Sequence, residues 1–402
     1  MSARVDAAIV GAGPAGSALA IQLARAGWSV ALVEKHPFPR RKVCGECIAA
    51  SNAGLLEALG AGDAFAHLAG PELRRVALLR GADRAVADLP RAAPPRVPWG
   101  RALGREALDT RLRDLARDTG VVVHQPCIAQ AIEGAPGRWK VTLRDAGSHA
   151  ARTLDATLAV AAHGSWERLP DERAAERAHR PGDLLAFKAN FRAAAMEEGV
   201  LPVLAFRGGY GGMVVAEDGL ATVACCIRRD RLQSVRATAP SLSAGLVVES
   251  LLRAEIEGVA RALAPATRVG AWLAAGPLRP GARVRADDAL LRVGNAAGEA
   301  HPIIGEGISM ALQSAALLAG ELLAHGSAAA AAARHAELAR RYAQAWRRAF
   351  APRLRLASLF AHAAMRPGAA ALLMALVHAW PGLLTEGARR GGKTRSIVEG
   401  MA

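Results

Sequence analysis

Apolar and polar positions at the start of the chain predict a strand, a helix and a second strand. A short apolar run covers residues 7–10, a helical pattern follows over residues 17–27, and a second apolar run over residues 30–33 ends at Glu34. A G-x-G-x-x-G turn separates the first strand from the helix. This order of elements is typical of a dinucleotide-binding βαβ unit.

The positions of that turn have distinct expected roles. Gly11 permits the tight turn, Gly13 lets the backbone approach a pyrophosphate, and Gly16 lets the helix pack closely on the strand. Ala15 lies at the helix N-terminus, where free N–H groups and the positive end of the helix dipole favour phosphate. Glu34 follows at about the 20-residue spacing at which a carboxylate meets the adenosine ribose.

The remaining pattern predicts a second, antiparallel sheet and several helices. An amphipathic helix is expected over residues 103–119, with leucines on one face. Glycine turns separate short strands that would form a cap over the dinucleotide unit, at residues 184–191, 203–206, 212–215 and 220–227. Helical patterns follow at residues 242–263, 309–323 and from about 334 to 384.

A second glycine-rich segment follows a short strand expected at residues 290–294. It reads Gly-Asn-Ala-Ala-Gly over residues 294–298 and reaches Gly305 and Gly307 where the long apolar helix begins. Such a loop can point backbone N–H groups at an anion or at the polar edge of a ring.

The two glycine segments together resemble those of FAD-dependent oxidoreductases of the aromatic hydroxylase and geranylgeranyl reductase superfamily, which is similar to the group A flavoprotein monooxygenases. The resemblance implies FAD as cofactor, with Gly294 and Asn295 at its ribityl–phosphate part and Gly305, Gly307 and Ile308 beside the isoalloxazine ring. The superfamily has an aspartate where this chain has Asn295, which can hydrogen-bond a hydroxyl but carries no charge.

The resemblance implies an α/β fold with a discontinuous Rossmann-type FAD-binding domain, an antiparallel β-sheet substrate cap and C-terminal helices. We expect the FAD-binding domain to comprise residues 1–75, 100–180 and 275–325. The other expected parts are a cap at residues 76–99 and 181–274, a helical region at 326–390 and a disordered tail at 391–402.

The loop after the second strand is rich in cations. Its prolines exclude a helix, and its Lys-x-Cys-Gly run at residues 42–45 matches one branch of the superfamily. Lys35, Arg40 and Lys42 are candidate contacts to phosphate or flavin, with a solvated basic loop as the alternative.

Two of the five cysteines, Cys44 and Cys47, form a C-x-x-C in this loop. Cys44 is a candidate catalytic thiol near the flavin, and a redox pair or small buried residues are the alternatives. Without a second pair or neighbouring histidines we expect no metal site. The odd cysteine count and the lack of a leader pattern favour a reducing cytoplasm.

Two further positions bear on the cofactor and its reductant. Arg105 opens an R-x-x-L-D helix start that, by the resemblance, approaches the flavin or its phosphates, with Arg101 as a competitor. His163 stands where NADPH-using aromatic hydroxylases have the acid of an Asp-Gly pair. The reductant is therefore left open between NAD(P)H and a separate flavin reductase.

The predicted cap supplies candidate substrate contacts. Phe187, Tyr210 and Met213 would line the pocket, and the glycines around Tyr210 indicate close approach of backbone to a ligand. The W-x-W-x-I-P segment of halogenases is absent. Lys188 is a candidate catalytic cation, or else a solvent-facing lysine, and His301 is a candidate proton shuttle, or else a satisfied loop histidine.

Charge changes the picture less than the glycine segments do. The net charge of +15 reflects either the composition of the source genome or an anionic partner. Dispersed arginines and 4% aromatic residues argue against nucleic acid binding.

Residues 340–355 repeat arginine at helical spacing, and residues 369–380 are apolar but too short to span a bilayer. We interpret the latter as a core helix, with peripheral membrane contact or an acidic-carrier dock as alternatives.

These observations predict an FAD-dependent monooxygenase that hydroxylates or epoxidises an apolar or aromatic small molecule through a flavin hydroperoxide. The substrate could be a biosynthetic, carrier-bound intermediate. A geranylgeranyl-reductase-like enzyme acting on a C=C bond is the alternative, and an FAD-binding accessory protein of a biosynthetic complex is a second alternative.

Overall fold

A mixed seven-stranded sheet carries the first glycine turn in the computed structural model, which describes residues 4–93, 97–145, 147, 150–165, 179–326 and 332–394. Its strand order is β7-β2-β1-β10-β9-β8, with β17 beside β10. Neighbouring strands are parallel from β7 to β10 and β17, and antiparallel from β10 to β8. The strands are β1 (Val5–Val10), β2 (Val30–Val33), β7 (Val122–His124), β8 (Cys127–Ala135), β9 (Arg138–Asp145), β10 (Ala151–Ala161) and β17 (Leu291–Arg292).

Both faces of this sheet are covered, which explains the uninterrupted apolar run at the start of the chain. Along β1, Ala7 and Ile9 pack toward helices, whereas Ala8 and Val10 pack toward the β8–β9–β10 meander. A strand buried on both faces needs apolar residues at every position. The covering helices are α1 (Pro14–Arg25), α4 (Arg105–Asp118) and α8 (Gly307–His325).

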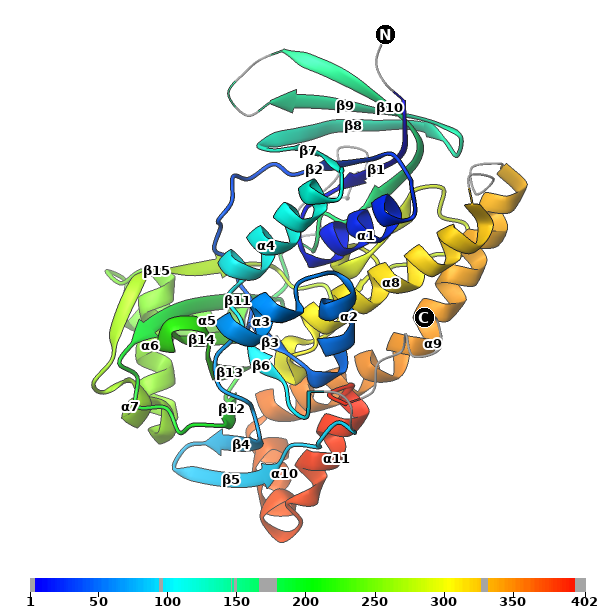
Figure 1. Cartoon of the computed structure of the whole chain (residues 1–402). Helices are drawn as coiled ribbons and strands as arrows, with labels where there is room; N and C mark the ends of the chain where they lie inside the picture. Colours follow the sequence, from blue (N-terminus) through cyan, green and yellow to red (C-terminus); the bar gives the residue numbers. More distant parts are fainter. Residues whose placement is uncertain are drawn as a thin grey trace.

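A second seven-stranded sheet has the order β15-β11-β14-β13-β12-β4-β5 and is antiparallel except where β4 pairs with β12. Its strands are β4 (Arg75–Arg80), β5 (Asp83–Asp88), β11 (Leu184–Arg192), β12 (Val200–Phe206), β13 (Gly209–Val215), β14 (Ala221–Arg228) and β15 (Thr267–Ala275). One face packs on α5 (Arg229–Thr238), α6 (Ala244–Glu255) and α7 (Glu257–Leu263). Figure 1 shows this sheet at the lower left, with the first sheet at the top.

Shorter elements connect the sheets. The pairs β3 (Cys47–Ile48) with β6 (Arg101–Ala102) and β16 (Gly281–Ala282) with β18 (Gly298–Glu299) form two-stranded ribbons. The remaining elements are the 3₁₀ helices η1 (Ala50–Asn52), η2 (Glu217–Gly219), η3 (Gly294–Ala296) and η4 (Pro302–Ile304), and the helices α2 (Ala53–Ala58) and α3 (Gly62–Leu68).

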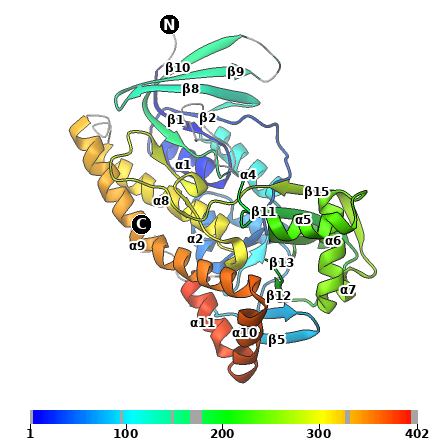
Figure 2. The ribbon, with the colours of Figure 1, turned by 180° about the vertical axis from the view of Figure 1, so that it is seen from behind.

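Three helices follow α8: α9 (Ala332–Met365), α10 (Pro367–Ala379) and α11 (Gly382–Gly391). Figure 2 shows α9 running along the back of the molecule from the side of α8 to α10 and α11. By length and composition α8 could cross a membrane, but 72% of its apolar window is buried, as in a core helix. The expected α/β fold with an antiparallel cap sheet and C-terminal helices is confirmed.

Several local expectations differ from the structure. Strands β8 and β15 were not expected, and the single helix expected at 242–263 is two helices, because Ile256 between them is extended at φ −133°. The sequence also predicts an exposed charged connection over residues 168–180, of which residues 168–178 lie outside the described part of the chain.

The expectation of a disordered tail is wrong for residues 391–394, and residues 395–402 lie outside the described part of the chain. Lys393 is buried, and its Nζ lies 3.1 Å from Glu306 Oε1 and 3.3 Å from the Gly305 carbonyl oxygen. Burial alone would lower the pKa of the Lys393 ammonium, but Cys47 and Glu306 raise it above its ordinary value. The end of α11 is therefore fastened to the loop before α8.

Lys393→Met should lower the free energy of unfolding by about 3 kcal/mol, because among the described residues it leaves the buried Glu306 carboxylate with Arg353 alone, 4.0 Å away. Arg390→Met, three residues earlier at the end of α11, is the matched control. Its side chain is 72% exposed, so a change within about 0.5 kcal/mol is expected. Urea unfolding of the three proteins measures the difference, and equal losses in both variants would contradict the anchoring role.

Candidate active site

The first glycine turn leaves no room for side chains at two of its glycines. A Cβ on Gly11, where φ is +113°, would lie 2.4 Å from the Ala162 carbonyl oxygen. A Cβ on Gly16 would lie 1.8 Å from the Gly11 carbonyl oxygen. Gly13 differs, since the nearest atom to an added Cβ is Arg105 Nη2 at 3.6 Å and its surface lines a cavity. Gly11 and Gly16 thus allow close packing of the backbone, and Gly13 leaves the cavity surface free of a side chain.

Glu34 is held beside this turn at the end of β2. Its carboxylate accepts the N–H of Ala12 at 3.0 Å and the N–H of His36 at 3.0 Å, and Arg40 Nη2 lies 3.4 Å away. Only 4% of Glu34 is exposed. This is the place where a ribose-binding acid lies in dinucleotide-binding units.

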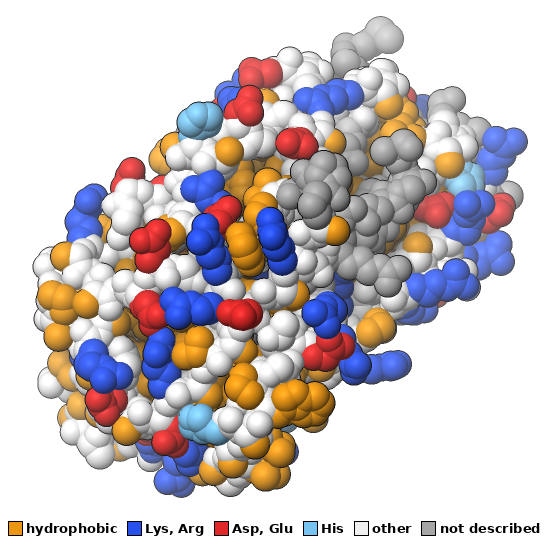
Figure 3. Space-filling view, turned by 60° about the horizontal axis from the view of Figure 1, so that its bottom comes forward, with side chains coloured by type: hydrophobic (Ala, Val, Ile, Leu, Met, Phe, Trp, Pro, Cys, Tyr) orange, Lys and Arg blue, Asp and Glu red, His pale blue; other side chains and the backbone are white. Residues whose placement is uncertain are grey.

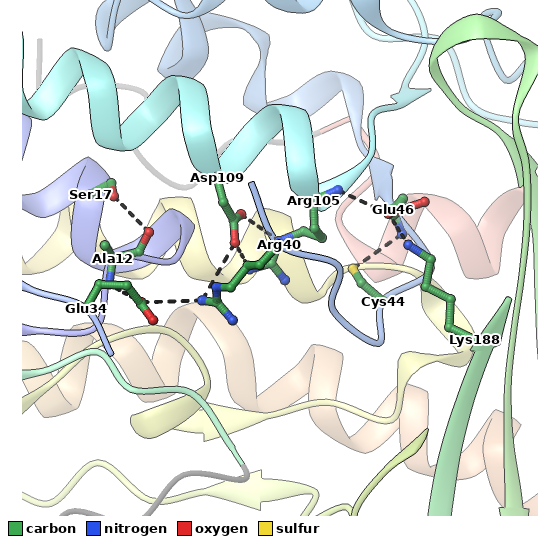
Figure 4. Close-up of polar contacts among 9 residues, drawn as sticks. All are labelled: Ala12, Ser17, Glu34, Arg40, Cys44, Glu46, Arg105, Asp109 and Lys188. Carbon is green, nitrogen blue, oxygen red and sulfur yellow. Dashed lines mark hydrogen bonds and ion pairs between the residues drawn. The ribbon is translucent and has the colours of Figure 1, made fainter. Parts of the chain in front are cut away.

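A chain of polar contacts continues from Glu34 toward the second sheet (Figure 4). Arg40 also approaches Asp109 at 3.9 Å, and Asp109 accepts two hydrogen bonds of 2.7 Å from the Arg105 guanidinium. The backbone N–H of Arg105, at the start of α4, donates to Glu46 Oε1 at 3.1 Å. Arg105 is therefore fixed in direction where it lines the cavity.

Glu46 ends this chain and joins the loop to the second sheet. Its carboxylate is fully buried, pairs with Lys188 of β11 and accepts the Thr222 hydroxyl of β14 at 2.5 Å. The Thr222 oxygen accepts from Asn190 at 2.7 Å, whose side-chain oxygen accepts from Arg41 at 2.7 Å. The backbone of Glu46 has φ +58°, which is unusual for a residue with a side chain. Cap strands thus hold the loop in a strained conformation.

The second glycine segment packs against the first. Gly294 has φ +60°, donates its N–H to Ser314 Oγ at 2.7 Å, and would bring an added Cβ within 2.8 Å of Ala15. Asn295 donates to Ser165 Oγ at 2.8 Å and lies 3.5 Å from Glu299 Oε1.

The departure from aspartate at position 295 has a local explanation. Burial raises the pKa of the Glu299 carboxyl, whose Oε1 also accepts the Ser165 hydroxyl at 2.8 Å. An aspartate at 295 would place a second carboxylate beside Glu299, whereas the Asn295 amide donates to it.

A single large cavity between the two sheets brings most of the predicted residues together. The predicted cofactor residues that line it are Gly13, Ala15, Lys42, Arg105, Gly294, Asn295, Gly305, Gly307 and Ile308. Cys44 and the three predicted substrate contacts, Phe187, Tyr210 and Met213, also line it. Gly11, Gly16, Glu34, Lys35, Arg40, Lys188 and His301 do not line it.

The residues outside the lining fall into two groups. Gly11, Gly16, Glu34 and Arg40 form the turn and its acid, and Lys35 is half-buried near them. Lys188 is 2% exposed and paired with Glu46, so the structure places it behind the cavity wall, neither solvent-facing nor open to a ligand. Its contact makes it a positioning residue for the loop.

His301 lies directly behind Tyr210. The Tyr210 hydroxyl and His301 Nδ1 are 3.0 Å apart, and the His301 ring packs edge-on against His362 with centroids 5.5 Å apart. Burial, with a smaller contribution from His362, lowers the pKa of His301 to about 4. Burial raises the pKa of Tyr210 well above its usual value. At neutral pH the pair is a neutral imidazole beside a protonated phenol.

Cys44 and Cys47 are both free thiols. Cys47 is buried, which raises its pKa, and its sulfur lies 3.6 Å from Lys393 Nζ. Cys44 is partly exposed and lines the cavity beside the Arg105 guanidinium. Both cysteines line the cavity, and Cys44 is the more exposed of the two.

Sequence reasoning missed several residues that shape the site. Glu46, Thr222, Asn190, Glu299 and Lys393 are buried polar groups whose partners are distant in sequence. Glu46 had a local signal, its place directly after Lys-x-Cys-Gly. The others had none.

Comparison with known proteins agrees with this geometry. A model described as "FAD binding domain" matches residues 4–350. The chain belongs to this FAD-binding family. It is an FAD-dependent oxidoreductase by family, and it shares its fold with solved halogenases, monooxygenases and a geranylgeranyl-reductase-like protein.

Individual relatives are distant. The menaquinone reductase of Mycolicibacterium smegmatis is 36% identical over 120 residues, which cover 30% of this chain and 28% of that protein. The myxobacterial chondrochloren halogenase CndH has a TM-score of 0.72 at 22% identity, covering 84% of this chain and 79% of CndH. A geranylgeranyl bacteriochlorophyll reductase-like protein of Thermoplasma acidophilum has a TM-score of 0.68 at 16% identity, covering 96% and 99%. The two solved structures share the fold.

The residues present fit FAD. The open surface at Gly13, the helix start behind it and the buried acid Glu34 suit the adenosine and pyrophosphate end. Gly305, with φ +62°, and Gly307 form a side-chain-free edge where α8 begins, which suits a flat ring. When bound, FAD supplies two-electron redox chemistry.

Gly13→Ala should fold normally but bind FAD at least tenfold more weakly, because the added methyl clashes with no protein atom and projects at the phosphate surface. Gly54→Ala, where an added Cβ meets nothing within 4 Å, is the matched control. Flavin fluorescence titration gives the affinity, and thermal melting monitors the fold. Unchanged FAD affinity in the Gly13 variant would remove this turn from the cofactor site.

The buried His301 predicts a pH dependence. Its pKa is about 4 in the folded protein and about 6.5 in the unfolded chain, so the unfolded state binds more protons between these values. Its contribution to stability is complete above pH 6.5 and is lost as the pH falls toward 4, by up to about 3 kcal/mol.

In His301→Gln that part of the pH dependence should disappear, while the exposed-site variant His67→Gln should follow the wild type. Urea unfolding at pH 7 and at pH 4.5 measures the effect. If wild type and the His301 variant lose the same stability, His301 is not held neutral by burial.

Proposed function

We propose that this protein is an FAD-dependent reductase that adds hydrogen to an apolar, unsaturated small molecule of the quinone or polyene class. The observation that carries the proposal is the substrate side of the cavity. Its wall is apolar at Phe187, Leu201, Val203 and Met213, and its buried protonatable phenol is Tyr210. Such a wall selects an apolar substrate and excludes water.

A reduction of this kind needs a hydride and a proton. FAD held at Gly13, Gly294 and Gly305 would supply the hydride when reduced. The Tyr210 hydroxyl holds a proton at the cavity, because burial keeps the phenol protonated at neutral pH. His301 Nδ1 can donate to or accept from that oxygen according to its tautomer, so the pair can pass a proton and be reprotonated from the side of His362.

The relatives support this choice over oxygenation. Two relatives that are 33% and 36% identical over part of the chain are named menaquinone reductases, and the chain spans only about a third of their length. Likeness to halogenases and monooxygenases is one of fold. For this reason we place the reductase ahead of the monooxygenase that the sequence favoured. The electron donor is then NAD(P)H or a separate flavin reductase.

A monooxygenase is the second candidate. The observation that favours it is the neutral His301 beside Tyr210, because this pair could equally take a proton from a phenolic substrate before oxygen transfer. The two reactions differ in their need for oxygen.

Reduced holoenzyme mixed anaerobically with a short-chain menaquinone analogue should show flavin reoxidation and stoichiometric reduced product. Tyr210→Phe should retain FAD but slow this step roughly 100-fold, as expected for loss of a general acid. Tyr342→Phe is the matched control, since the only other tyrosine bonds the Arg292 carbonyl away from the cavity.

Absence of anaerobic reoxidation, with oxygen incorporated into product in air, would replace the reductase by the monooxygenase. FAD binding without either reaction would favour the accessory protein.

A further inference from the structure

Helix α10 has an unusual outer face. It contains no charged residue, and its inner side, with Ala370, Met374 and Val377, is buried. On the opposite side Leu372 is 62% exposed and Leu376 is 48% exposed, and Trp380, directly after the helix, is 66% exposed. Large apolar side chains in this number on one helix face are seldom left to water in a soluble monomer.

The preceding helix adds cations to the same end. Arg348, Arg355 and His362 are exposed at helical spacing along α9, Leu359 among them is 66% exposed, and the exposed Arg366 lies between α9 and α10. No acidic residue occurs between Glu337 and Glu386. Within the described part of the chain, Arg348, Arg355 and Arg366 have no carboxylate within ion-pair distance. We call this surface, formed by Leu359, Leu372, Leu376, Trp380 and the three arginines, the α9–α10 face.

Nearby acids do not neutralise the face. Glu386 of α11 is bound by Arg389 and Arg390, and Asp83 of β5 is bound by Arg80. Figure 3 turns this end of the molecule toward the reader and shows apolar patches with basic and acidic side chains around them. The apolar side chains suit the acyl part of a bilayer interface. The cations that border them suit the phosphates of anionic lipids.

The inner side of the same helix packs toward the cavity wall. Ala370, Met374 and Val377 of α10 belong to one buried apolar cluster with Tyr210 and Cys226, which line the cavity.

We propose that the α9–α10 face docks on the surface of an anionic lipid bilayer. Leu372, Leu376 and Trp380 enter the interfacial layer, and the α9 arginines meet lipid phosphates. Delivery of an apolar substrate to the cavity from this side rests on the proposed function, whereas docking itself does not.

A bilayer fits better than a protein partner. The helix is 13 residues long with a tryptophan at its end, so it can lie in the interface but cannot span it. A second copy of the chain would bring the same arginines together, and like charges would oppose that contact. An acidic protein would pair with the arginines but would not require three large apolar side chains in water.

The test is sedimentation of holoenzyme with vesicles of phosphatidylcholine alone or with about 30% phosphatidylglycerol. Wild type should bind the anionic vesicles, more weakly as salt rises, and should bind the neutral ones poorly. The double variants Leu372→Gln/Leu376→Gln and Arg348→Gln/Arg355→Gln should each lose at least about tenfold in partitioning. Leu68→Gln on α3, where Leu68 is 49% exposed, is the matched control and should bind as wild type does.

Trp380 gives an independent readout of depth. Brominated lipid should quench wild type more than Trp380→Phe, and the difference should vanish in the leucine double variant.

Wild-type binding that the four substitutions leave unchanged would overturn the proposal. So would a dimer in sedimentation velocity that the leucine variant abolishes, because the face would then bind a second copy. These measurements record binding to vesicles alone, so their result does not depend on the outcome of the reductase assay.

Discussion

The buried carboxylate of Glu46 joins the two halves of this molecule. It pairs with the Lys188 ammonium and accepts a hydrogen bond from the Thr222 hydroxyl, both on the second sheet. It also accepts a hydrogen bond from the backbone N–H of Arg105 at the start of α4. Removing both charges from water costs several kcal/mol per ion, and positive φ at a residue with a side chain adds about 1 kcal/mol or more. The loop can hold this geometry only because all three partners are in place. Cys44 and Arg105, which face the cavity, are positioned as a consequence.

Local periodicity was enough to predict most of the fold. The run ending in Val10, the amphipathic α4 and the cap strands β11 to β14 each show their burial in the spacing of apolar residues. Strand β15 was missed because its burial is uneven and Gly270 interrupts it, and β8 because its register slips against β9. The order of residues 391–394 was not predictable, since Lys393 finds its partner at Gly305, 88 positions earlier.

The residues of the site also divide into those whose proximity the sequence predicted and those whose proximity it did not. The glycine turn and Glu34 lie within one βαβ unit, so their spacing alone predicted their proximity, and the exclusion of a Cβ at Gly11 and Gly16 follows from that geometry. The ion pair of Glu46 spans 142 positions and its bond to Thr222 spans 176. No pattern in the sequence predicts contact between residues so far apart. For this reason the sequence indicated Lys188 as a catalytic candidate and did not predict its ion pair with Glu46. Asn295 shows the same limit, since its amide is explained only by Glu299 beside it.

The two ends of the cavity differ in whether backbone or side chains form their surface, and this difference bears on which reaction the site can support. The cofactor end is formed mainly by backbone at Gly13, Gly294 and Gly305, which can serve any FAD chemistry without change. The opposite wall depends on side chains of β11 to β14 and on the packing of α10 behind Tyr210. Because Met374 and Val377 face that wall while Leu372 and Leu376 face outward, a few substitutions in one helix would alter both the pocket and the outer surface. Substitutions in α10 would therefore change the pocket wall and the outer surface together, whereas the backbone groups at the cofactor end would stay as they are.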